Sequence, residues 1–121
     1  MSEGRADIDQ RDSEIRKTVL TCLCQRERRA LFVTELATAL RKAHGISASD
    51  VERALAALEA DWSVIIRDYY CADPHVVGTD LRIVALVEPY EGDDGQMQAI
   101  REVEVTWHEW LAEYMANHRC S

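Results

Sequence analysis

The sequence predicts an α+β fold in which helices build the first half of the chain, and a β-hairpin and a long helix build the second. Two kinds of pattern support this fold class. Apolar residues recur every three or four positions in three segments between residues 13 and 60, and again between residues 96 and 118, which is the period of an α-helix. Residues 64–71 and 80–89 are instead rich in β-branched and aromatic side chains and flank a turn-like segment, as the two strands of a hairpin do.

The chain has the size and composition of one globular domain. It has 121 residues and a net charge of −8. Residues 1–12 are polar and charged, so we expect a flexible N-terminus and not a signal peptide. No apolar run approaches the length of a membrane span, and four cysteines without a secretory signal are expected to be reduced thiols. We therefore expect a cytoplasmic protein that has no membrane partner.

The charge is distributed unevenly along the chain. Residues 11–53 carry nine basic and six acidic side chains, whereas residues 54–121 carry four basic and thirteen acidic ones. Affinity for nucleic acid depends mainly on the neutralisation of phosphates by Lys and Arg, so the overall charge argues against unspecific binding of polyanions. The earlier part of the chain has a positive balance and can still face phosphates.

The first two helices are predicted on either side of a short strand. The first helix is expected to begin at Ser13, and the β-prone residues 31–33 follow it. A second helix over residues 35–44 comes next, with Thr34 in the N-cap position and Gly45 as the stop after its last turn.

The third helix is predicted from a capping box, in which Ser49 is followed three residues later by Glu52. Val51, Leu55 and Leu58 continue it at helical spacing. The hairpin after this helix has a loop that is too long for a two-residue turn. One face of its second strand is expected to carry Leu81, Ile83, Ala85 and Val87.

Residues 93–118 are predicted to form a long amphipathic helix that closes the chain. Pro89 ends the strand before it, Asp93 or Asp94 can cap it, and Met97 begins its apolar series. Aromatic residues at helical spacing more often belong to a core or an interface than to a ligand pocket. We expect this helix to form a homodimer. The predicted dimer interface consists of Ile100, Val103, Trp107, Trp110, Leu111 and Tyr114.

The order of elements over residues 13–89 resembles the winged helix-turn-helix superfamily, which implies three helices plus a β-hairpin wing. The stretch TELATALRKAHGISASDVERALAALE carries the most specific part of the resemblance, because its apolar residues stand at the core positions of a helix-turn-helix. The last helix is similar to the dimerisation helix of small regulators of the PadR and MarR kinds. Two features depart from the pattern. Trp62 and Ser63 stand where many members have a glycine, and residues 72–80, at the expected wing tip, include no Lys or Arg.

The resemblance implies a DNA-binding transcriptional regulator that reads double-stranded DNA with the start of the third helix. Arg53 is the side chain there that can make a bidentate contact with guanine, and cations around it would contact phosphates. The alternative is a solvated face, because three arginines within residues 26–29 also balance the negative end of a helix. The residues implicated in DNA binding are Ser47, Ser49, Arg53, Arg26, Arg28, Arg29, Arg41 and Lys42.

The acidic residues of this region favour a second interpretation. Five acidic and two basic side chains lie between Ser47 and Asp68, and Asp73 and Asp80 at the expected wing would repel phosphate. The chain can therefore be an acidic winged-helix module that binds a protein partner and does not bind DNA.

The sequence has no motif of an enzyme or a metal site. It lacks a glycine-rich phosphate loop and a nucleophile elbow, and its four histidines are scattered. Cys22 and Cys24 have the spacing of a cysteine-x-cysteine metal motif, but residues two apart on a helix point away from each other. We expect neither catalysis nor a cofactor.

Overall fold

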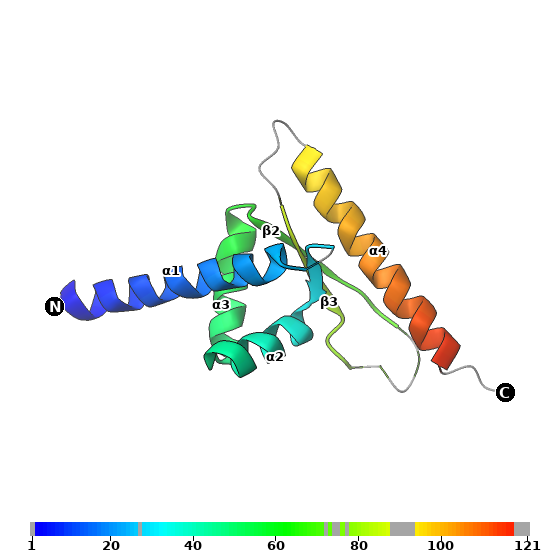
Figure 1. Ribbon diagram of the computed structural model, residues 1–121, viewed down its shortest axis with the longest axis horizontal. Coiled ribbons are helices and arrows are strands. Elements are labelled where there is room, and N and C mark those ends of the chain that lie inside the picture. Colours follow the sequence, from blue (N-terminus) through cyan, green and yellow to red (C-terminus); the bar gives the residue numbers. More distant parts are fainter. Residues whose placement is uncertain are drawn as a thin grey trace.

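The computed structural model describes residues 2–26, 28–71, 73, 76, 78–87 and 94–117. Over these residues the chain has an α+β fold, with helices on both faces of an antiparallel sheet (Figure 1). The elements, in chain order, are α1 (Ser2–Cys24), β1 (Ala30–Phe32), α2 (Val33–His44), α3 (Ala48–Ala60), β2 (Val64–Asp68), β3 (Arg82–Leu86) and α4 (Asp94–Asn117).

The sheet has the strand order β1–β3–β2, so the third strand of the sequence lies in the middle. Val84 of β3 lies opposite Leu31 of β1 and Ile66 of β2. Successive side chains of a strand point to opposite faces, and the two faces here are covered by different helices. Val84 packs with α1, α2 and α3, whereas Ile83 and Ala85 pack with α4. The predicted hairpin and the shared face of its second strand are confirmed.

The first helix begins at Ser2 and not at Ser13 as the apolar pattern predicted. Figure 1 shows its N-terminal half reaching out from the body of the molecule. This half has few apolar residues, which is why helical periodicity did not detect it. Two of its charged side chains instead contact α3: Arg11 Nη2 lies 3.3 Å from Asp50 Oδ2, and Asp12 Oδ1 lies 3.7 Å from Arg53 Nη1.

The predicted caps of α2 and α3 are both displaced. Helix α2 begins at Val33, directly after β1, and Phe32 is its N-cap residue without a side-chain hydrogen bond. Thr34 therefore lies in the first turn. Helix α3 is capped by Ser47, whose Oγ accepts a hydrogen bond of 3.2 Å from the backbone N–H of Asp50. The sequence offers two serines two residues apart, and the chain uses the earlier one.

The last helix covers the sheet on the side away from α1, α2 and α3 (Figure 1). Its buried positions are spaced by four residues, at Ala99, Val103 and Trp107. Met97, predicted to begin the apolar series, lies two residues before Ala99 and therefore on another face, where it is exposed. The predicted long amphipathic helix is otherwise confirmed.

Helices α2 and α3 are both followed by a residue in the left-handed conformation, but this residue is glycine after α2 and tryptophan after α3. After α2, Gly45 takes φ = 66°, and Ile46 N–H donates to Leu40 O. After α3, Trp62 takes φ = 63°, and Ser63 N–H donates to Leu58 O. Trp62 N–H also donates to Glu59 O, and the two bonds after α3 make a Schellman motif, whereas Gly45 N–H donates to Arg41 O as in the simpler αL motif. The left-handed position of both motifs is normally glycine. Trp62 therefore occupies a backbone conformation that its side chain disfavours.

We expect Trp62→Gly to raise the free energy of unfolding by about 1 kcal/mol, because glycine adopts the left-handed conformation without steric cost. Gly45→Ala is the matched control and should lower the free energy of unfolding. A Cβ at Gly45 meets no atom within 4 Å, so only the backbone conformation opposes the substitution. Urea unfolding followed by circular dichroism measures both. A loss of stability in Trp62→Gly would mean that packing of the indole outweighs the backbone strain.

Candidate nucleic-acid interface

The outward face of α3 is the surface that the resemblance assigns to DNA. Val51, Leu55 and Leu58 are buried against the other helices and the sheet, as predicted. The opposite face consists mainly of short side chains. Its exposed residues are Ala48, Ser49, Glu52, Arg53, Ala56, Ala57, Glu59 and Ala60.

Arg53 lies within a cluster of two arginines and two aspartates. Its Nη2 donates a hydrogen bond of 3.2 Å to Asp50 Oδ1, and its Nη1 lies 3.7 Å from Asp12 Oδ1. Arg11 contacts the second oxygen of Asp50. The cluster is neutral overall. Because the arginine side chains remain largely exposed to water, these ion pairs are weak, and Arg53 can exchange its partners at small cost.

A second cluster joins α3 to the hairpin. Arg82 Nε donates a hydrogen bond of 2.9 Å to Asp80 Oδ1, and Arg82 Nη1 donates one of 2.9 Å to Glu52 Oε2. The hydrogen bond from Arg82 is the main reason that the pKa values of both carboxyl groups lie below their usual range, and the two carboxylates raise the pKa of Arg82. Glu52 therefore does not serve the capping box predicted for it. It holds the loop end of the β2–β3 hairpin against α3.

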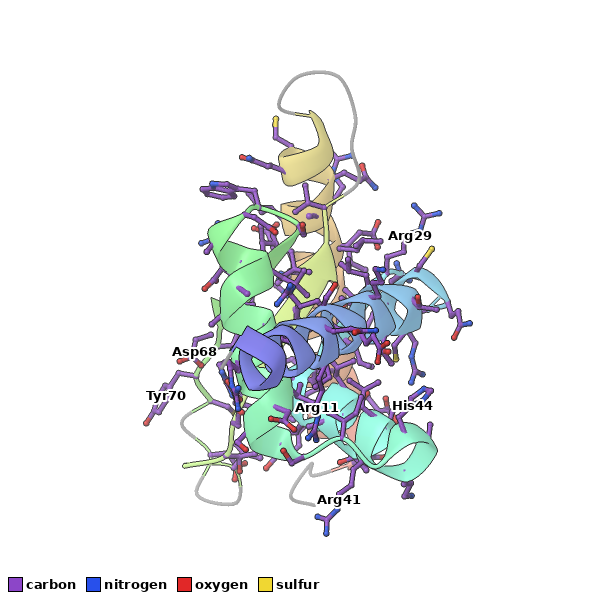
Figure 2. The ribbon with its side chains drawn as sticks, turned by 90° about the vertical axis from the view of Figure 1, so that its left-hand side faces the viewer. Arg11, Arg29, Arg41, His44, Asp68 and Tyr70 are labelled. Carbon is purple, nitrogen blue, oxygen red and sulfur yellow. The ribbon has the colours of Figure 1, made fainter. Side chains whose placement is uncertain are left out.

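The predicted phosphate contacts are divided between two regions. Figure 2 places Arg29 on the other side of α1 from Arg11 and Arg41. Arg28 donates through Nε to Glu109 Oε2 of α4, 3.1 Å away, and through Nη2 to the other oxygen of that carboxylate. Cations in the loop after α1 therefore lie away from the start of α3 and do not form a continuous surface with it.

The predicted DNA-binding residues that lie near one another are at the turn between α2 and α3. Arg41 and Lys42 are exposed in the last turn of α2, and the turn leads directly to the start of α3. There the hydroxyl oxygens of Ser47 and Ser49 are 3.3 Å apart. Arg11 also belongs to this region, and sequence analysis missed it because residues 1–12 were expected to be flexible.

The expected wing tip, residues 72–80, is described at residues 73, 76 and 78–80, and its other residues lie outside the described part of the chain. Asp80 is paired with Arg82 and does not present a free negative charge. Asp73 acts on Tyr114 of α4: burial raises the pKa of the Tyr114 hydroxyl, and a hydrogen bond with Asp73 adds to the rise. This part of the hairpin loop therefore contacts the end of α4.

The aromatic face of α4 packs on its own chain, which corrects part of the predicted dimer interface. Val103 and Trp107 are buried against the sheet, so neither is available to a second copy. Trp107 stacks on Tyr69 at a centroid distance of 4.6 Å, and Trp110 stacks on Tyr114 at 5.2 Å. The sheet needs this cover because Ile83 and Ala85 of β3 point toward α4. The other predicted residues, which keep partial exposure, are Ile100, Trp110, Leu111 and Tyr114.

Other site types have little support among the described residues. No three His, Cys, Asp or Glu side chains in this part of the chain gather as metal ligands would. Cys22 and Cys71 are half-buried beside the two cores, and Cys24 is exposed. None of the described helices combines the length and apolarity needed to cross a membrane.

The Arg82 cluster makes stability depend on acidic pH. In the unfolded chain Glu52 and Asp80 titrate near their ordinary pKa values of 4.5 and 3.8, and in the folded chain they titrate at lower pH. The cluster therefore stabilises the fold fully above these values, and its contribution is lost as the pH falls through the lowered pKa values. The partners are partly exposed, so we expect Arg82→Gln to cost at most about 1 kcal/mol at neutral pH.

Urea unfolding measured from neutral to acidic pH tests this expectation. The curve for Arg82→Gln should be flatter than that of the wild type below about pH 4.5. Arg101→Gln removes an exposed arginine of α4 and should leave the acidic limb unchanged. Parallel curves for the wild type and Arg82→Gln would refute the stabilising role of the cluster.

Comparison of the chain with models of protein families, with curated proteins and with solved structures yields no match.

Proposed function

We propose that this chain is a winged-helix transcriptional regulator that binds double-stranded DNA. The order α1, β1, α2, α3, β2, β3 supports the proposal, since it is the order on which the resemblance to that superfamily depends. Helices α2 and α3 would form the helix-turn-helix, with Gly45 in the turn between them. The β2–β3 hairpin would be the wing. Function does not follow from such a fold alone, so the surface of α3 has to carry the argument.

The observation that carries the proposal is the composition of the exposed face of α3. Short side chains such as Ala48, Ser49 and Ala56 let the helix backbone approach a surface closely. The major groove is about 12 Å wide, and a helix with its side chains measures about 10–12 Å across, so a helix with short side chains enters most easily. Arg53 stands on this face within reach of a base edge. Arg41 and Lys42 lie at the end of α2 where the adjacent phosphates would pass.

The charges around α3 predict a modest affinity for DNA that depends on a small number of cations. The cluster of Arg82, Glu52 and Asp80 leaves one net negative charge beside the helix. Phosphate binding would therefore depend on a few cations at the α2–α3 turn, and affinity should fall with salt with a log–log slope of about −2 to −3 per chain. A dimer would double this number.

We propose a cytoplasmic homodimer whose contacts include the half-buried side chains Trp110, Leu111 and Tyr114 of α4.

We expect Arg41→Ala/Lys42→Ala to weaken binding to mixed genomic duplexes by roughly tenfold at low salt and to reduce the salt slope by about 2 per chain. The matched control is Arg28→Ala/Arg101→Ala, which removes the same charge on the α4 side of the molecule. Fluorescence anisotropy over a salt titration measures both. Equal losses in the two variants would indicate attraction by net charge alone, and no loss in either would remove the α2–α3 turn from the interface.

A second candidate function, binding of a protein partner, is favoured by one observation. Trp62 is 60% exposed beside a pocket of about 540 Å³ lined by Leu20, Cys24, Leu86 and Val87. A large exposed aromatic held in a disfavoured backbone conformation is typical of a residue kept for function and not for stability. Exposed apolar patches with such an anchor commonly mark protein interfaces.

This alternative predicts a partner whose binding requires the indole. Affinity capture with the wild type should yield a stoichiometric protein, and Trp62→Gly should lose that protein although its fold is at least as stable. Tyr70→Ala, which removes another strongly exposed aromatic, should retain it. A captured protein that all three chains retain would exclude Trp62 from the interface.

A further inference from the structure

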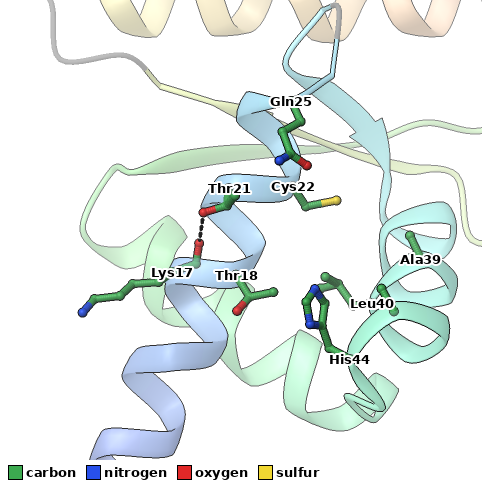
Figure 3. A pocket seen from close by; sticks show the side chains of 9 residues that line it. Lys17, Thr18, Thr21, Cys22, Gln25, Ala39, Leu40 and His44 are labelled. Atoms are coloured by element: carbon green, nitrogen blue, oxygen red, sulfur yellow. Dashed lines mark hydrogen bonds between the residues drawn. The ribbon is translucent and has the colours of Figure 1, made fainter.

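A pocket of about 380 Å³ lies between α1 and α2 on the side of the molecule shown in Figure 3. Thr18, Thr21 and Cys22 line it from α1, and Gln25 lies just after that helix. Its volume is within the range of pockets that hold small ligands. No charged cluster or predicted site described above includes it.

The pocket exists because the two helices present short side chains to each other. On α2 the facing residues include Ala39 and Ala43, which cannot reach α1. On α1, Thr18 Oγ1 donates a hydrogen bond of 2.8 Å to the backbone oxygen of Glu14, and Thr21 Oγ1 donates one of 2.9 Å to that of Lys17. These hydroxyls bond to their own helix and do not bridge to α2. The pocket is therefore a cleft that opens to solvent along Thr21, Gln25 and Ala43, with the buried Leu40 at its floor.

The lining has an apolar centre with hydrogen-bond donors at its ends. Leu40 and Ala39 form one wall and Cys22 faces them, while Figure 3 shows Gln25 at one end and His44 at the other. The ionisable side chains that can carry a full charge in the lining, Lys17 and His44, are both bases, and no Asp or Glu lines the pocket. Figure 3 shows Lys17 directed away from α2, so it contributes to the local potential and His44 is the basic group nearest the cavity.

We propose that this pocket binds a small carboxylate with an apolar body. The body would lie against Leu40 and Ala39, and the carboxylate would accept hydrogen bonds from His44 or Gln25. Binding would also adjust α3, because α2 leads into α3 through the Gly45 turn, whereas α1 packs mainly on α3 itself. A ligand wedged between α1 and α2 therefore changes how the two helices of the helix-turn-helix are presented. This regulatory step rests on the proposed DNA binding, but the binding site does not.

The test uses three probes that share one body and differ in charge: hexanoate, hexanamide and hexylamine. Titrations of the ¹⁵N-labelled full chain should give saturable shifts at Thr18, Cys22, Ala39 and His44 with hexanoate, with a Kd on the order of millimolar. Hexanamide should bind more weakly and hexylamine should not bind. His44→Leu, which removes the hydrogen-bond donor, should weaken hexanoate by roughly threefold and hexanamide by less, because a hydrogen bond to a charged acceptor is the stronger one.

Two variants separate occupation of the pocket from unfolding. Ala43→Leu fills the space from an exposed position of α2 and should abolish the shifts with all probes, whereas Ala112→Leu makes the same change on α4 and should have no effect. Binding of hexanoate that survives Ala43→Leu, or no saturable shift at these residues with any probe, would overturn the proposal. Equal affinity for hexanoate and hexylamine would refute the carboxylate selectivity.

The regulatory step has its own readout. Hexanoate should change the affinity of the wild type for duplex DNA at constant ionic strength and leave that of Ala43→Leu unchanged. Shifts without any DNA binding would refute the proposed function and keep the site. DNA binding that is insensitive to a bound probe would refute the coupling alone.

Discussion

The rest of the structure depends on the burial of the central strand β3 on both faces. Ile83, Val84 and Ala85 have no exposed surface, and because their side chains alternate they need two separate covers. Helices α1, α2 and α3 cover Val84, and α4 covers the other two residues. The position of α3 follows from the first core. The placement of the aromatic residues of α4 follows from the second core, since they cover the sheet and are not fully exposed to a partner.

Charged side chains also join α3 to the elements beside it. Arg82 bonds to Glu52 and so joins the hairpin to α3, while the pairs Arg11–Asp50 and Asp12–Arg53 join α1 to α3. The contribution of each pair to stability is small because the partners remain in contact with water. Their consequence is geometric. Acidic residues that would repel a phosphate in isolation already have cationic partners within the chain, so the charge of −8 overstates the repulsion near α3.

Much of the fold was predictable because it is encoded in local patterns. The period-two alternation of β3 and the spacing of Val51, Leu55 and Leu58 each specify an element and its buried face. The N-caps were not predictable, since Ser47 and Ser49 are equivalent candidates by type, whereas Gly45 at the end of α2 was predicted. The charged half of α1 and the partners of Arg28 and Arg53 were also missed. These features depend on contacts between residues distant in sequence, which periodicity does not report.

The same contacts bear on what α3 can recognise. Arg53 is held by Asp50 and Asp12, so a phosphate or base edge must compete with two carboxylates for one guanidinium. An isolated phosphate offers about the same charge as a carboxylate and gains little from the exchange. A major groove offers a bidentate base contact for Arg53, together with phosphates for Arg41 and Lys42. These contacts would offset the loss of the two carboxylate partners. The aspartates would then act against unspecific polyanions and in favour of a duplex that satisfies the whole surface. The acidic residues of α3 are in this respect compatible with the proposed binding of DNA.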